Sequence, residues 1–71
     1  MAMRFEVVND STENVKVFGD MESSVEYINA RLHENFTVYI SGVSGASAVV
    51  ERIKAELYNS LSNVSRVEVR G

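Results

Sequence analysis

The sequence lacks cysteine, proline and tryptophan, and its 71 residues include one histidine, His33. Without cysteine the chain can form neither a disulfide framework nor a cysteine-based zinc site, and one histidine cannot build a metal site alone. We therefore expect no metal and no cofactor. A chain of this length buries only about 60% of the surface that its unfolded form exposes. We expect one domain, residues 1–71, whose thin core favours self-association.

Long apolar runs are also missing. No segment has the length of a membrane-spanning helix, and residues 1–5 lack the apolar stretch of a signal peptide. We therefore expect a soluble protein in the cytoplasm with no membrane partner. Basic character is missing as well, because the formal net charge is −3 at pH 7. Since nucleic-acid partners usually require a basic surface, this charge disfavours them, and we expect a protein partner or a second copy of the chain.

What the sequence does contain is alternation of apolar and polar residues, the period of a β-strand with one buried face. This alternation predicts strands at residues 3–7, 15–18, 36–41 and 65–70. A polar run of turn-forming residues, 9–14, joins the first two strands and predicts a hairpin. The strand residues expected in the core are Phe5, Val7, Val15, Val17, Phe36, Val38, Ile40, Val67 and Val69.

Two other segments repeat apolar residues every three or four positions, as a helix with one buried face does. In the first, Asp20 is expected to cap the start of the helix. Its apolar stripe consists of Met21, Val25, Ile28 and Leu32. The second helix is expected to begin at about Ser44 or Ser47 and to end at about Leu61. Its stripe consists of Ala46, Val49, Val50, Ile53, Leu57 and Leu61.

The predicted order of elements is therefore ββαβαβ, in which each helix connects two strands. Right-handed crossovers place both helices on the same face of a sheet. The sequence thus predicts an α+β fold, a two-layer sandwich of a mixed four-stranded sheet with two helices on one face. The other face of the sheet is expected to be open.

The glycine-containing segment 41–47, SGVSGAS, joins a predicted strand to a predicted helix. Free amide groups at the start of a helix can hold a phosphate or a carboxylate, and glycine permits close approach of the backbone. The candidate ligand-binding residues are Gly42, Ser44, Gly45 and Ser47. The segment lacks the lysine of a P-loop and the third glycine of a dinucleotide fingerprint, so a plain turn with a serine cap is the alternative.

Ser44 also fits a relaxed nucleophile-elbow pattern, because it lies between Gly42 and Ala46 on a strand-to-helix turn. Catalysis would need a base, and the only histidine, His33, falls at the far end of the first helix from this turn. We therefore expect no enzymatic activity and no catalytic residue, with His33 facing solvent.

Residues that alternate with the core positions are expected on the open face of the sheet. The candidate interaction residues on that face are Arg4, Lys16, Phe18, Tyr39, Arg66 and Arg70. Two aromatic rings could stack nucleic-acid bases there, yet Glu6 and Glu68 on the same face would repel phosphates. Alternating charges with a few apolar residues suit a self-complementary or partner-binding surface better.

Three functional hypotheses follow. The first is a non-enzymatic, homo-oligomeric protein-interaction module that binds or regulates a larger partner through its open sheet face or a sheet edge. The second is a binder of a small anion, phosphate or a nucleotide, at the turn 41–47. The third is a binder of single-stranded nucleic acid at the open face.

Overall fold

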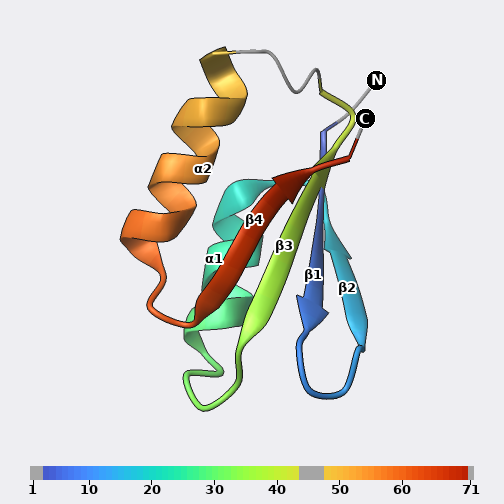
Figure 1. Cartoon of the computed structure of the whole chain (residues 1–71), viewed down its shortest axis with the longest axis vertical. Helices are drawn as coiled ribbons and strands as arrows, with labels where there is room; N and C mark the ends of the chain where they lie inside the picture. The colour runs from blue at the N-terminus through green and yellow to red at the C-terminus, as the bar shows by residue number, and fades with distance from the viewer. Residues whose placement is uncertain (1–2, 44–47, 71) are drawn as a thin grey trace.

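The structure is a computed structural model that describes residues 3–43 and 48–70 (Figure 1). Its elements are β1 (Arg4–Asn9), β2 (Val15–Phe18), α1 (Met21–Asn29), β3 (Phe36–Ser41), α2 (Ala48–Ser60) and β4 (Val64–Val69). The order ββαβαβ and the α+β sandwich predicted from the sequence are therefore confirmed.

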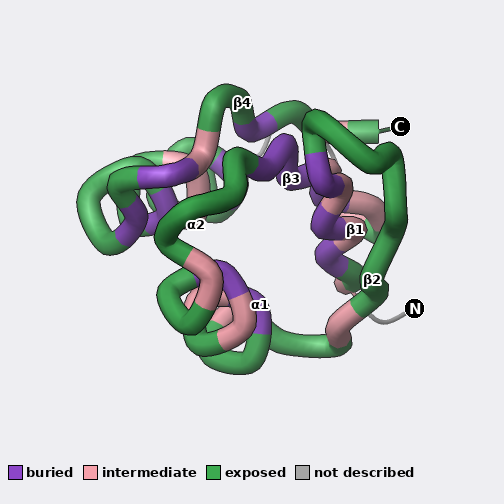
Figure 2. Tube along the Cα trace, turned by 90° about the horizontal axis from the view of Figure 1, so that it is seen from below, coloured by how far each residue is buried: buried purple, intermediate pink, exposed green. Residues whose placement is uncertain are grey.

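The four strands form one mixed sheet in the order β2-β1-β3-β4. Strand β1 runs antiparallel to both of its neighbours, whereas β3 and β4 run parallel. Both helices lie on the same side of the sheet, with α1 beneath β1 and β2 and with α2 beside β4 (Figure 2). No element within residues 3–43 and 48–70 covers the other face of the sheet, and β2 and β4 are its two edges.

The core lies between the sheet and the helices. Its buried apolar residues are Phe5, Val7, Ile28, Phe36, Val38, Ile40, Val50, Leu57, Leu61 and Val67. Two residues of the predicted helical stripes do not belong to the core, because Leu32 is 60% exposed and Val49 is 53% exposed. Helix α1 ends at Asn29, so Leu32 falls in the turn after the helix, where the helical spacing no longer applies.

Strand β2 has the opposite alternation from the one predicted. Phe18 pairs with the buried Phe5, and residues directly opposite each other share a sheet face. Lys16 and Phe18 therefore lie on the helix side of the sheet, and Val15 and Val17 lie on the open side. The predictions that the two valines are in the core, and that Lys16 and Phe18 are on the open face, are wrong.

The hairpin loop explains this reversal. Asn9 N–H donates to the Asn14 carbonyl at 2.9 Å, and Glu13 N–H donates to the Asn9 carbonyl at 2.8 Å, with Glu13 at φ 65°. The Asn9 side-chain oxygen accepts two further backbone N–H groups of the loop. These bonds fix a four-residue loop, 10–13, and a change of one residue in the register moves every side chain to the other face.

Helix α1 is capped at both ends by side chains. Asp20 accepts a hydrogen bond from Ser23 N–H at 2.7 Å, which confirms the predicted cap. This hydrogen bond is the main reason why the pKa of Asp20 is lowered. At the other end, the side-chain amide of the buried Asn63 donates to the carbonyls of Ile28, Arg31 and Glu34 at 3.0–3.1 Å. Asn63 thereby joins the end of α1 to the start of β4.

Candidate protein-interaction surface

The open face of the sheet is arranged in rows that cross the four strands. One row runs Val15, Val8, Thr37 and Arg66, and the next runs Val17, Glu6, Tyr39 and Glu68. Each row therefore begins with a valine on β2 and ends with a charged residue on β4. The face is apolar at one edge and charged at the other.

The two arginines on the β3–β4 half of the open face are each paired with a glutamate, one on β1 and one on β4. Arg70 Nη1 lies 2.8 Å from Glu6 Oε1, and the Arg70 guanidinium carbon lies 3.9 Å from the centroid of the Tyr39 ring. Arg66 Nε lies 2.9 Å from Glu68 Oε2. A hydrogen bond with the Tyr39 hydroxyl, and then the charge of Glu68, raise the pKa of Arg66. Both arginines are thus already engaged, which does not favour phosphate binding on this half.

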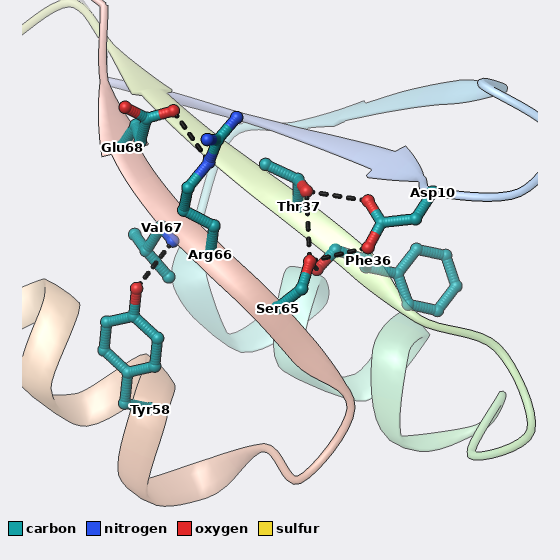
Figure 3. A network of polar contacts seen from close by, with 8 residues as sticks. All are labelled: Asp10, Phe36, Thr37, Tyr58, Ser65, Arg66, Val67 and Glu68. Atoms are coloured by element: carbon teal, nitrogen blue, oxygen red, sulfur yellow. Dashed lines mark hydrogen bonds and ion pairs between the residues drawn. The ribbon is translucent and has the colours of Figure 1, made fainter.

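A second polar cluster joins β3 and β4 to the hairpin loop (Figure 3). The Asp10 carboxylate accepts from the Thr37 hydroxyl at 2.7 Å and from the Ser65 hydroxyl at 2.6 Å, and Asp10 N–H donates to the Asn35 carbonyl. Ser65 is the extra residue of a bulge in β4. Through these hydrogen bonds the cluster holds the hairpin loop, β3 and β4 together.

The edge formed by β4 is partly covered by helix α2. The Val67 N–H points away from β3 and donates to the Tyr58 hydroxyl at 2.8 Å (Figure 3). A side chain that occupies an outward N–H blocks the addition of another strand at that point.

The edge formed by β2 is open by contrast. Asn9 N–H donates to the Asn14 carbonyl, so the main-chain groups of Asn14 face β1. Along an antiparallel pair of strands, residues whose main-chain groups face the neighbouring strand alternate with residues whose groups face away. The main-chain groups of Lys16 and Phe18 therefore face β1, and those of Val15 and Val17 face outward. Among the described residues, no strand pairs with this side of β2. The edge carries a row of outward donors and acceptors that can pair with another strand.

The outward valines are also exposed at their side chains, at 54% for Val15 and 55% for Val17. Figure 2 shows β2 in the exposed colour along most of its length. Exposed β-branched residues on an unpaired edge are a surface that natural proteins usually cover or charge. The apolar side chains and the free main-chain groups of β2 thus coincide at one place.

A pocket of about 360 Å³ lies on the helix side beside this edge. It is lined by Phe18 at the end of β2, by Ser23, Glu26 and Tyr27 on one side of α1, and by Ala30 and Arg31 directly after that helix. The rings of Phe18 and Tyr27 lie 5.3 Å apart, and the guanidinium carbon of Arg31 lies 3.8 Å from the centroid of the Tyr27 ring. The pocket therefore has aromatic walls and one carboxylate, Glu26.

The structure brings together only some of the predicted site residues. Arg4, Tyr39, Arg66 and Arg70 share the open face, and Lys16 and Phe18 are on the opposite side. Of the candidate anion site, Gly42 is exposed at φ 81°, a conformation that suits glycine. Ser44, Gly45 and Ser47 lie outside the described residues.

Sequence reasoning named Lys16 and Phe18 of β2 as candidate interaction residues, on the wrong face, and missed the other residues of the β2 edge and its pocket. Val15 and Val17 read as core residues because alternation gives a strand's two faces without saying which face is buried. The lining residues Glu26 and Tyr27 are three and four positions after Ser23, a spacing that places them on one side of a helix. That spacing was the available signal for the pocket.

Comparisons with family models, with curated proteins and with solved structures found no match to this chain. In the part of the chain that the structure describes, no helix is long and apolar enough to cross a membrane. Within residues 3–43 and 48–70, no three acidic or histidine side chains gather closely enough to hold a metal ion.

Proposed function

We propose that this chain is a non-enzymatic protein-interaction module that binds an extended strand of a protein at the free edge of β2. The observation that carries the proposal is that the main-chain groups of Val15 and Val17 face outward on an edge that has no strand neighbour in the described part of the chain. Strand addition uses such groups for affinity and uses the alternate side chains for specificity.

The contrast between the two edges supports the same function. Tyr58 occupies an outward N–H on β4, and the charges of that half are paired on the open face. The β2 edge combines unpaired main-chain groups with two exposed valines and an adjacent pocket. An incoming strand would bury the valines on one side and place its alternate side chains over the pocket on the other side.

Site-specific photo-crosslinking in the cells that make the full chain tests this proposal. A photo-reactive phenylalanine analogue is introduced at Val15, and the matched control carries it at Glu68, on the same face but at the other edge. We expect covalent adducts from position 15, to another protein or to a second copy, and few from position 68.

Val17→Pro in the same chain supplies the second arm of the test. Proline removes the outward N–H of residue 17 and leaves the bonds between β2 and β1 in place, because a proline is tolerated where the N–H faces solvent. We expect the adducts from position 15 to disappear. Equal yields from the two positions, or adducts that persist with Val17→Pro, would contradict the proposal.

A further inference from the structure

We infer that the strand bound at this edge is β2 of a second copy of the chain, antiparallel and with Val17 of both copies on a two-fold axis. The inference rests on the proposed function and specifies its partner. The resulting dimer would join two four-stranded sheets into one continuous sheet and would remove the open edge of each.

The hydrogen-bonding pattern limits the possible registers. Only odd-numbered residues of β2 direct their main-chain groups outward, so an antiparallel copy must place odd-numbered residues opposite odd-numbered ones. A two-fold axis can then pass through Val15, Lys16 or Val17. These three registers differ in which side chains they place opposite each other.

Two of the registers meet physical obstacles. An axis through Lys16 would place two ammonium groups directly opposite each other, and like charges in such cross-strand pairs are destabilising. An axis through Val15 would place Val17 opposite the partner's Glu13, which has φ 65° in the hairpin loop and does not continue the strand. The axis through Val17 avoids both, since it places Val15 opposite the partner's Gly19, which follows directly on β2 and has no left-handed φ.

This remaining register also brings opposite charges together. It places Lys16 opposite Phe18 of the partner subunit, whose ring lines the pocket that also contains Glu26. The Arg31 that lines the same pocket is already held, since its Nη1 donates to the Tyr27 carbonyl at 2.9 Å. The two ion pairs found among the described residues do not use Glu26. Lys16 of one copy can therefore reach an aromatic-walled pocket of its partner that offers the Glu26 carboxylate, beside an Arg31 guanidinium that is held against the Tyr27 ring.

Single-cysteine variants test the register, because the sequence contains no cysteine and every disulfide formed is therefore between chains. Val17→Cys places two thiols in a hydrogen-bonded pair with Cα atoms about 5.5 Å apart, within the range of a disulfide. In this register residue 15, or residue 16, of one copy is offset along the strands from the same residue of the other copy. Their Cα atoms then lie more than about 7 Å apart, too far for a disulfide. We expect Val17→Cys to form at least about ten times more disulfide dimer than Val15→Cys or Lys16→Cys under mild oxidation at micromolar concentration.

A charge exchange tests the contact between Lys16 and the pocket. Lys16→Glu and Glu26→Lys should each raise the dissociation constant of the dimer in sedimentation equilibrium, by about tenfold or more, and the double variant should recover most of the loss. Additive losses in the double variant, or faster cross-linking through residue 15 or 16, would overturn the register. A wild-type chain that stays monomeric at every concentration would overturn the dimer, whereas adducts to another protein from position 15 would leave the proposed function standing.

Discussion

Asn63 shows how one buried side chain can determine where two elements meet. Its side-chain amide nitrogen donates to one carbonyl of α1 and to two carbonyls in the turn after that helix, and the main-chain carbonyl of Asn63 accepts from Phe36 N–H at 3.0 Å at the start of β3. Buried polar groups that lose their partner cost about 1–3 kcal/mol each. The end of a helix and the start of two strands therefore depend on this residue.

We expect Asn63→Ala to lower the free energy of unfolding by about 2–4 kcal/mol, because it leaves the carbonyls of Ile28, Arg31 and Glu34 with fewer donors. Urea denaturation followed by circular dichroism measures this change. The matched control is Asn59→Ala on the exposed side of α2, which should change stability by less than about 0.5 kcal/mol. Equal effects of the two substitutions would contradict this role of Asn63.

At Asp20, stability should depend on pH in a defined direction. Hydrogen bonds from Ser23 lower the pKa of Asp20 below 3.8 in the folded chain. A carboxyl whose folded pKa is depressed stabilises the fold fully above its unfolded pKa, and this contribution is lost as the pH falls through the folded value. Asp20→Ala should therefore lower the thermal midpoint at pH 7, and its difference from the wild type should shrink as the pH falls below the usual pKa of an aspartate and through the lowered pKa of Asp20.

The control for this effect is Asp20→Asn, which keeps an oxygen acceptor at the cap without the charge. We expect the thermal midpoint of Asp20→Asn at pH 7 to be close to that of the wild type. On acidification, its midpoint should fall less than the wild-type midpoint does. A difference between the wild type and Asp20→Ala that does not change with pH would show that the ionised carboxylate is not the stabilising form.

At the scale of the elements, strand β2 separates what sequence can predict from what it cannot. All six elements were predicted, because apolar periodicity depends on each segment alone, although the stripe predicted for α1 runs to Leu32 and the helix ends at Asn29. The face on which Val15 and Val17 lie depends on the length and hydrogen bonding of the loop before them. In that loop Glu13 adopts a left-handed conformation, with φ 65°. Glycine or asparagine at this position would have predicted that conformation, whereas glutamate does not.

Two proline substitutions test the register of β2. Val17→Pro removes an outward N–H and should reduce the free energy of unfolding only slightly, whereas Lys16→Pro removes an N–H that faces β1 and should cost about 3 kcal/mol or more. Urea denaturation of both variants at a low protein concentration measures the difference. A larger loss of unfolding free energy for Val17→Pro than for Lys16→Pro would mean that the N–H of Lys16, and not that of Val17, faces outward at the edge.

At the scale of the whole molecule, the two edges of the sheet differ in how far a helix covers them. Helix α2 covers part of β4 through Tyr58, and α1 lies beneath β2 without covering its outer side (Figures 1 and 2). A chain of this size buries a smaller fraction of its surface on folding than a larger protein does. Pairing of an open apolar edge with another strand would bury additional apolar surface. The candidate site could not be predicted from the sequence because it depends on this tertiary difference between the edges.

Residue-resolved amide hydrogen exchange along β2, measured as the concentration of the wild-type chain rises, tests strand addition at this edge most directly. The amides of Lys16 and Phe18 face β1 at every concentration and serve as an internal reference. We predict that the Val17 amide exchanges fast in dilute solution and slows by at least about tenfold as dimers form, together with the Val15 amide. Fast exchange at Val15 and Val17 at every concentration, with Lys16 and Phe18 protected, would contradict the pairing of this edge with a second copy.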